Sequence, residues 1–286
     1  MAVDFAELYR KMDPKRWKIL DSIFHYMWKY EYIPSDLISK HSKIGLEKVE
    51  IILRDLSDKK LVLNKRLNYF GSSFTFKGLS LYSLWRLAEK DEVEMLGKLM
   101  GEGKESTVYN CISRYGESVI KFHRLGHPAF KKVREKRDYG TFHFSVLAVR
   151  SAKNEFQALN RLYGIVRTPR PLSWEGNAVL MEIIDAKELF KVRLSNPEYV
   201  LNLIIDEVKE MYKAGIIHGD LSQYNVLVSE EGVWLIDFPQ FVDANSENAE
   251  NYLLRDLNNI IKYFKKNYGI EKNVENVLEY VKSEKD

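Results

Sequence analysis

The chain has 286 residues, of which 45% are apolar and 13% aromatic, so it can bury a sizeable core and global disorder is excluded. Its single cysteine, Cys111, excludes a disulfide framework and a cysteine-based zinc site, and indicates a reducing compartment. The net charge is only +3, but residues 1–90 hold 17 Lys/Arg against 11 Asp/Glu, whereas residues 91–286 hold 27 against 30. This basic surplus favours a polyanionic partner for the N-terminal third, the alternative being a solvated basic surface.

The first segment, to about residue 90, predicts three helices and a hairpin. PKRWKILDSIFHYMWKY has helical periodicity and predicts a core-facing stripe made of Trp17, Leu20, Ile23, Phe24, Met27 and Trp28. Pro34 breaks this stretch, SDLISKHS predicts a short helix capped by Ser35, and LEKVEIILRDLSDKKLV predicts a third helix. LVLNKRLNYFGSSFTF then alternates like two short strands. This order is typical of a winged-helix domain, whose third helix can enter a nucleic-acid groove, although many winged helices bind protein instead.

After a connecting helix that begins near Lys77, the periodicity changes. Short apolar runs (VEMLGKLM, STVYNCI, ESVIKF and NAVLMEII) predict strands, and stretches over 144–163, 198–214 and from Tyr252 onward predict helices. Strands first and helices later indicate an α+β domain. We therefore divide the chain into a winged-helix domain with its connecting helix (1–90), a strand-rich lobe (91–184) and a helix-rich lobe (185–286). No run of about 18 apolar residues and no apolar signal-peptide core is present, so we expect a cytoplasmic protein without a membrane span.

Polar residues that can carry chemistry interrupt the apolar segment IIHGDLSQYNVLV. The apolar runs around His218, Asp220 and Asn225 read as buried strands, where an unpaired carboxylate is costly. Twelve residues after Asn225, Asp237 ends another strand-like run. Oxygen ligands at strand ends suit Mg²⁺, which takes carboxylates together with substrate phosphates. The spacing H-x-D-x-x-x-x-N followed by D-F matches the catalytic and metal loops of protein kinases, so Asp220 is predicted to orient and deprotonate an attacking hydroxyl or align a water, and Asn225 and Asp237 to bind metal.

Upstream of these loops lie two further kinase-like features. Gly101, Glu102 and Gly103 stand between two predicted strands, where backbone without side chains can approach phosphates, although G-x-G alone is a weak signal and no P-loop motif is present. Lys121 lies in an otherwise apolar strand and needs a partner. Glu155, in the helical stretch AKNEFQAL, is the natural candidate, and the pair would hold Lys121 against the α- and β-phosphates.

Taken in order, GEGKEST, VIKFHRLG, AKNEFQAL, HGDLSQYNVLV and LIDFPQ resemble the RIO kinases, and the first segment resembles the subfamily that carries an N-terminal winged helix. The resemblance covers nearly the whole chain. It implies a two-lobed protein-kinase-like (RIO) fold, ATP with Mg²⁺ or Mn²⁺, seryl autophosphorylation, and a role in maturation of the small ribosomal subunit. It also implies slow ATP hydrolysis through phosphorylation of the metal-loop aspartate.

Carried over by position, the resemblance implies Asp220 as the catalytic aspartate, Asn225 and Asp237 as metal ligands, and Lys121 as a phosphate ligand. It implies an adenine-binding hinge made of Met181, Glu182 and Ile184. The phosphate loop implied in the same way comprises Gly101, Glu102, Gly103, Lys104, Glu105 and Ser106.

The motifs depart from those of ordinary protein kinases. Ser106 replaces the third glycine of the loop, so the Ser106 hydroxyl and Lys104 are expected to contribute instead. Gly219 replaces the arginine of H-R-D, and Pro239 replaces the glycine of D-F-G. No A-P-E follows, so a standard activation segment and peptide platform are not expected.

The segment 124–143 is a basic insert that we expect to be mobile. Its cationic residues are Arg124, Lys131, Lys132, Arg134, Lys136 and Arg137. The insert and the winged helix are the predicted contacts to pre-ribosomal RNA or a ribosomal protein; a solvated loop is the alternative. His123 and His127 are expected to be surface histidines, and Ser145 and Ser151 are candidate autophosphorylation acceptors.

The sequence thus predicts a winged helix joined to an ATP- and Mg²⁺-dependent serine/threonine protein kinase or ATPase switch. Two rivals stay open. An aminoglycoside- or choline-type phosphotransferase shares the HGDL…N loop, but such enzymes carry more helical structure after the metal loop. A nucleic-acid-binding regulator with a degenerate kinase fold is the other rival, and the intact set of Lys121, Glu155, Asp220, Asn225 and Asp237 argues against it.

Overall fold

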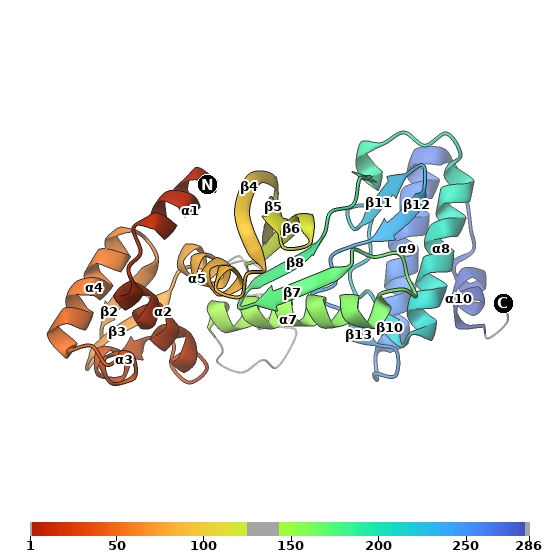
Figure 1. Ribbon diagram of the computed structural model, residues 1–286. Coiled ribbons are helices and arrows are strands. Elements are labelled where there is room, and N and C mark those ends of the chain that lie inside the picture. The colour runs from red at the N-terminus through yellow and green to blue at the C-terminus, as the bar shows by residue number, and fades with distance from the viewer. Residues whose placement is uncertain (1, 125–142, 284–286) are drawn as a thin grey trace. The chain divides into compact units, whose positions relative to one another are not determined.

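The computed structural model describes residues 2–124 and 143–283 and falls into two compact units (Figure 1). Unit 1 comprises Met1–Lys153 and Ser173–Leu180, and unit 2 comprises Asn154–Leu172 and Met181–Asp286. Apart from Arg124 and His143, the basic insert lies outside the described residues, as do His127, Lys131, Lys132, Arg134, Lys136 and Arg137.

Unit 1 begins with helices and a small sheet. These elements are α1 (Ala2–Arg10), α2 (Pro14–Tyr26), β1 (Ile33–Pro34), α3 (Ser35–Ser42), α4 (Leu46–Asp58), β2 (Val62–Arg66) and β3 (Phe70–Phe74). The strands β2 and β3 form an antiparallel hairpin, and β1 pairs with the free edge of β3. The predicted order of three helices and a hairpin is confirmed, and α1 precedes it as a helix that the periodicity did not indicate.

Three details of this region differ from the prediction. Ser35 is the first residue of α3, and Pro34 holds the cap position without a side-chain hydrogen bond. The third helix ends at Asp58, because Lys60 takes a left-handed conformation (φ 60°) that turns the chain into the hairpin. Trp28 is 41% exposed because α2 has already ended, whereas Trp17 is buried and stacks on Trp85 with ring centroids 4.9 Å apart.

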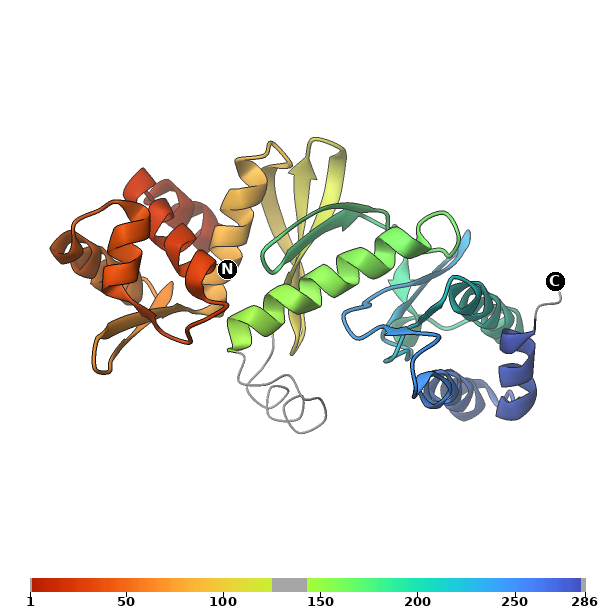
Figure 2. The same ribbon diagram turned by 90° about the horizontal axis from the view of Figure 1, so that it is seen from below.

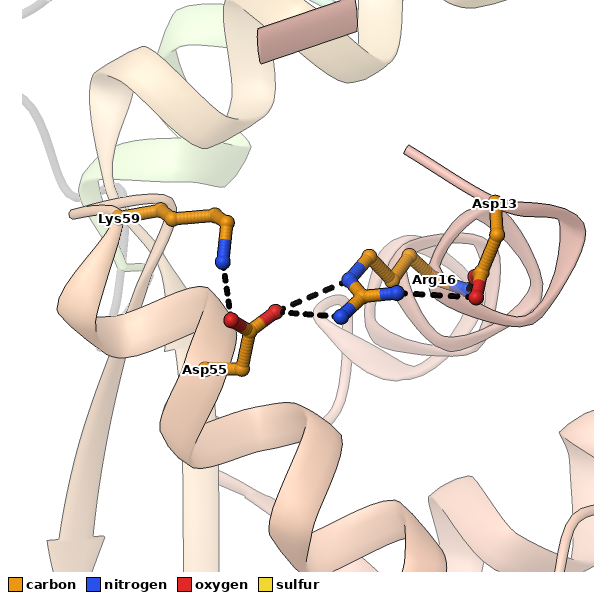
Figure 3. A network of polar contacts seen from close by, with 4 residues as sticks. All are labelled: Asp13, Arg16, Asp55 and Lys59. Carbon is orange, nitrogen blue, oxygen red and sulfur yellow. Dashed lines mark hydrogen bonds and ion pairs between the residues drawn. The ribbon is translucent and has the colours of Figure 1, made fainter. Parts of the chain in front are cut away.

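A polar network joins the start of α2 to the end of α4 (Figure 3). Asp13 caps α2 by accepting a hydrogen bond from the backbone N–H of Arg16 at 2.8 Å. The Arg16 guanidinium donates to Asp55 through Nε at 2.9 Å and lies 2.8 Å from it through Nη2, and Lys59 pairs with the other oxygen of the same carboxylate. One carboxylate therefore holds the two helices together.

The second part of unit 1 is a helix and an antiparallel sheet. Its elements are α5 (Phe76–Ala88), β4 (Val93–Glu102), β5 (Ser106–Ser113), β6 (Gly116–His123), β7 (Pro171–Glu175) and β8 (Ala178–Glu182). The sheet order is β4-β5-β6-β8-β7. Aromatic contacts attach α1 to this sheet, because Phe5 lies edge-on to Tyr109 and near Phe122. Cys111 is a free cysteine buried on β5.

Asn177, in the turn between β7 and β8, is fully buried and bonds to α5 and β6. Its Nδ2 donates to the hydroxyl of Ser80 at 3.1 Å and to the carbonyl of His123 at 2.7 Å. The hydroxyl of Ser83 donates to its Oδ1 at 2.8 Å. His123 is itself only 2% exposed, so the expectation of a surface histidine was wrong at this position: it is the last residue of β6, which lies between β5 and β8.

Unit 2 consists mainly of helices with short antiparallel strands. Its elements are β9 (Lys187–Glu188), the 3-10 turn η1 (Leu189–Lys191), α8 (Pro197–Lys213), β10 (Ile216–Ile217), β11 (Val226–Ser229), β12 (Gly232–Leu235), β13 (Val242–Asp243), α9 (Ala249–Tyr268) and α10 (Val274–Lys282). The helix α7 (Phe144–Leu162) belongs to unit 2 from Asn154 onward. The helices α8, α9 and α10 pack on one another, and Figure 2 looks nearly along the axes of α8 and α9. Among the described helices, none combines the length and the apolar character that crossing a membrane requires.

Candidate active site

The predicted phosphate loop, residues 101–106, comprises the last two residues of β4, the turn that follows and the first residue of β5 in unit 1. It is closed by a hydrogen bond from the N–H of Gly103 to the carbonyl of Ser106 at 2.9 Å, and Arg124 braces it by donating to the carbonyl of Gly103 at 2.6 Å. Neither Gly101 nor Gly103 has a positive φ, and a Cβ placed on either would meet no protein atom closer than 3.8 Å. The protein itself therefore does not require glycine here, whereas a ligand that approaches the backbone would.

Lys121 lies on β6 opposite Val108 of β5 and is 7% exposed. Glu155 lies on α7 and is 1% exposed. The two residues belong to different units, so their pairing stays a prediction. Of the predicted hinge, Met181 is buried at the end of β8, Glu182 is exposed and Ile184 is partly buried.

The predicted catalytic and metal loops of unit 2 are bound to each other through Asn225. Its Nδ2 donates to the carbonyl of Asp220 at 2.9 Å, and its own carbonyl accepts from the N–H of Ile236 at 3.0 Å. His218, which is fully buried, also reaches Ile236, with Nε2 2.9 Å from the carbonyl oxygen. The two motifs, separate in the sequence, thus form one structure around residues 218–225 and 236–238.

The Asp220 side chain does not have the burial that its apolar flanks predicted. Residues Ile216 to Gly219 are buried, but the chain reaches the surface at Asp220, which is exposed. Desolvation by the surrounding protein raises the pKa of Asp220, with His218 and Arg255 acting to lower it and Asp237 to raise it. The negative charge of Asp237 is the smallest of these influences, and it disfavours ionisation of Asp220.

Asp237 takes a left-handed backbone conformation with a φ of 72°. This conformation is uncommon for residues other than glycine, and Asp and Asn adopt it more readily than most. The next residue, Phe238, is fully buried, and its N–H donates to the carboxylate of Glu155 at 3.3 Å. Glu155 therefore helps to hold the metal loop, a contact within unit 2 that the sequence did not indicate.

Two adjacent residues of α9, not predicted from the sequence, support the catalytic loop. Asp256, 1% exposed, accepts hydrogen bonds from the N–H groups of Gly219 at 2.8 Å and Leu221 at 3.1 Å. Arg255 donates to the carbonyl of Gly219. The sequence contains a signal for the burial of Asp256. This residue lies three positions after Leu253 and four before Ile260, so its carboxylate falls within the apolar stripe of the helix.

The donor set fits Mg²⁺ held partly by a nucleotide. In the described part of the chain, no three His, Cys, Asp or Glu side chains gather so that they could hold a metal. The Nδ2 of Asn225 donates a hydrogen bond to the carbonyl of Asp220, so the amide oxygen of Asn225 is available to a cation. Asp237 would add a carboxylate. Two such ligands are what Mg²⁺ uses when phosphates and water complete its coordination.

Of the two serines suggested as phosphate acceptors, Ser145 lies at the start of α7 and is 1% exposed, so its hydroxyl is not accessible in this conformation. Ser151 lies on the same helix and is partly exposed.

Comparison with known proteins agrees with this arrangement. The family model described as "RIO domain" matches residues 107–277, and the model described as "Rio2, N-terminal" matches residues 9–90. The chain is 35% identical to the RIO-type serine/threonine-protein kinase Rio2 of Methanocaldococcus jannaschii, over 89% of this chain and 99% of that protein. It is 31% identical to the serine/threonine-protein kinase rio2 of Schizosaccharomyces pombe, over 90% and 77% of the two chains.

Solved structures give the same result. The Rio2 kinase of Chaetomium thermophilum, in its complex with ADP, Mg²⁺ and phosphoaspartate, matches with a TM-score of 0.80 and 26% identity, over 97% of this chain and 89% of that one. A second structure of that kinase has the same TM-score. The expected fold, a winged helix followed by a RIO kinase domain, is thereby confirmed. The chain belongs to the RIO family of serine/threonine-protein kinases, in the branch that carries the Rio2 N-terminal domain.

Proposed function

We propose that this protein transfers the γ-phosphoryl group of ATP to a seryl hydroxyl, in itself or in a protein partner. The observation that carries the proposal is the junction of the two loops in unit 2, where Asn225 binds the backbone of Asp220 while Ile236 binds that of Asn225. The carboxylate of Asp220 is exposed at this junction, where an incoming hydroxyl can reach it.

Each polar group then has a role. Asp220 orients the acceptor hydroxyl and takes its proton as the oxygen attacks phosphorus. Asn225 and Asp237 hold the metal, with Glu155 fixing the backbone that follows Asp237. When bound, Mg²⁺ would neutralise charge on the phosphate oxygens.

The remaining residues implied by the family resemblance would bind the nucleotide. The turn from Gly101 to Ser106, open to the approach of phosphates, and Lys121 would bind the phosphate groups, and the segment from Met181 to Ile184 would meet adenine. The match to a relative solved with ADP and Mg²⁺ supports this assignment.

We propose in addition that Asp237 itself can accept the phosphoryl group. Its carboxylate oxygen would bond to the γ-phosphorus while the bond to the β-phosphate oxygen breaks, releasing ADP, and water would later hydrolyse the acyl phosphate. The phosphoaspartate in the relative of known structure supports this reaction as an ATPase cycle.

Labelling with γ-³²P-ATP and Mg²⁺ tests both activities at once. Phosphoserine resists hydroxylamine, whereas an acyl phosphate is cleaved by it, so the stability of the label identifies the acceptor. We expect Asp237→Ala to abolish both labels and the Mg²⁺-dependent thermal stabilisation by ATP. A protein that binds ATP–Mg²⁺ but never acquires a label would exclude transfer to itself, and label on added aminoglycoside or choline would favour the small-molecule rival.

The winged helix supports a second proposal, namely docking on RNA of the small ribosomal subunit during its maturation. Lys15 of α2 and Lys48 of α4 are both exposed, and Lys15 lowers the pKa of Lys48. Adjacent ammonium groups of this kind favour a phosphate backbone as partner. Loss of affinity for small-subunit RNA in Lys15→Glu/Lys48→Glu, with a shallower salt dependence, would support this; unchanged RNA affinity with loss of binding to a ribosomal protein would favour a protein partner.

A further inference from the structure

A groove of about 610 Å³ lies on unit 2 beside the predicted catalytic loop. One wall is the loop segment Ser222–Tyr224, which begins two residues after Asp220, and the opposite wall is the outer face of α9. Phe190 of η1 closes one side. We call it the α9 groove, and its central residues are Phe190, Tyr224, Lys262 and Lys266.

The groove is cationic. Lys262 and Lys266 are one helical turn apart on α9, so both ammonium groups reach the same space. Both are exposed, and within residues 2–124 and 143–283 neither forms an ion pair with a carboxylate. None of the residues that line the groove is acidic. Lys265, between them on the same helix, instead pairs with Glu271 at 2.7 Å.

The groove also offers an apolar wall. Phe190 and Tyr224 are 42% and 57% exposed, and their rings meet edge-on with centroids 4.8 Å apart. Large aromatic side chains left exposed side by side mark a binding surface more often than scattered ones do. An edge-on pair forms a mixed wall for an aliphatic or aromatic side chain, whereas successive nucleic-acid bases need open ring faces on which to stack.

The walls are held in place by hydrogen bonds from α9. Tyr263 donates to the carbonyl of Leu189 at 3.2 Å, beside Phe190, and Asn259 donates to the carbonyl of Leu221 at 3.0 Å, beside the catalytic loop. Both sides of the groove therefore move with one helix, and a bound segment would be presented at a fixed distance from Asp220. Such pre-organisation favours binding because little ordering is needed.

We infer that the α9 groove binds an acidic segment of the protein acceptor, with carboxylates or phosphates at Lys262 and Lys266 and an apolar side chain against Phe190 and Tyr224. The inference rests on the proposed kinase function, because it names the acceptor of that reaction. The α9 groove would then select the protein acceptor, a role that the peptide platform near an A-P-E segment has in ordinary protein kinases.

The test compares short peptides that each contain one serine and one leucine, flanked by Asp/Glu, by Ala or by Lys/Arg. Phosphoryl transfer and fluorescence anisotropy of labelled peptide are measured on the full chain. We expect the acidic peptide to be preferred over the neutral one by about tenfold, with a preference that falls as salt is added. Lys262→Glu/Lys266→Glu should abolish this preference and favour the basic peptide. Lys265→Glu, which reverses the charge of the paired lysine, should leave it unchanged.

The anisotropy measurement needs no catalysis, so it separates this inference from the kinase proposal. Acidic peptide that binds in a Lys262- and Lys266-dependent way but is never phosphorylated would support the groove and count against the kinase activity. Equal binding of all three peptides, or an acidic preference that survives the double reversal, overturns the inference. So does a labelled single-stranded RNA that loses binding in the double variant while the peptides are unaffected, which would make the groove an RNA site.

Discussion

Asp256 accepts a hydrogen bond from the backbone N–H of Gly219 at 2.8 Å, one residue before the candidate catalytic aspartate. Its second oxygen accepts from Leu221, so the carboxylate holds the backbone on both sides of Asp220. Desolvation raises the pKa of Asp256, while His218 and the two backbone donors act to lower it. Hydrogen bonds to a carboxylate are stronger than those between neutral groups, so Asp256 fixes the backbone on both sides of the candidate catalytic aspartate.

Replacing Asp256 with asparagine tests this anchor. The new NH₂ group would face one of the two backbone N–H donors, leaving it without an acceptor. We expect a loss of about 1–3 kcal/mol in the free energy of unfolding, from denaturant titration. The rate of phosphoryl transfer should fall more than ATP binding does, because the misplaced group is Asp220. Asp243→Asn, which removes an exposed ion pair with Arg161, is the control and should change neither. Wild-type stability and kcat in Asp256→Asn would contradict this role.

Gly219 is required for two separate reasons. Its φ is 80°, and a Cβ at this position would lie 2.4 Å from the carbonyl oxygen of Gln240. Gly269 has a similar φ of 70° but nothing within 4 Å of its Cβ position. Gly269→Ala should therefore cost about 1 kcal/mol for backbone strain alone, and Gly219→Ala clearly more, with loss of activity. Equal melting temperatures for the two variants would show that the Gln240 contact is relieved without cost.

The same residue explains why an H-R-D motif cannot fit this loop. An arginine at position 219 would bring a Cβ and a long side chain against Gln240, and the space near the Gly219 carbonyl is already used by Arg255. The departure from the ordinary kinase motif is therefore built into the local backbone.

Periodicity and motif spacing predicted the positions of many of the strands and helices correctly. The strands that carry Lys121 and precede Asn225, and the helix that carries Glu155, lie where the apolar runs predicted them. The features that were not predicted depend on contacts between residues that are distant in the sequence. Nothing near Asp220 shows that the chain surfaces there, and nothing near Asn177 shows that it will bond to Ser80 and His123. The roles assigned to Lys121, Asp220, Asn225 and Asp237 stay proposals.

The buried side chain of Asn177 is expected to stabilise unit 1. Its side chain is fully buried and makes hydrogen bonds with Ser80, Ser83 and the backbone of β6. Leucine at this position would fill the volume but leave those groups unsatisfied. We expect Asn177→Leu to lower the free energy of unfolding by about 1–3 kcal/mol or more, since several partners lose bonds. Ser80→Ala, which removes one of the hydrogen bonds, should cost less. A Leu variant as stable as the wild type in urea would mean that water replaces the network.

Asp55 is expected to make the stability of the winged-helix region depend on pH. Burial raises the pKa of Asp55, but hydrogen bonds and charges from Lys59 and Arg16 outweigh it, so the net pKa lies below the ordinary value of 3.8. Because the folded-state pKa is lower than the unfolded one, the ionised group stabilises the fold above the unfolded pKa, and this stability is lost as pH falls through the folded value. The network is partly exposed, so its contribution is about 1 kcal/mol at most. Urea titrations at pH 6 and near pH 3 should show a smaller acid-induced loss for Asp55→Asn than for the wild type. Asp58→Asn, an exposed carboxylate on the same helix, should follow the wild type, and a parallel loss in all three proteins would remove Asp55 as the cause.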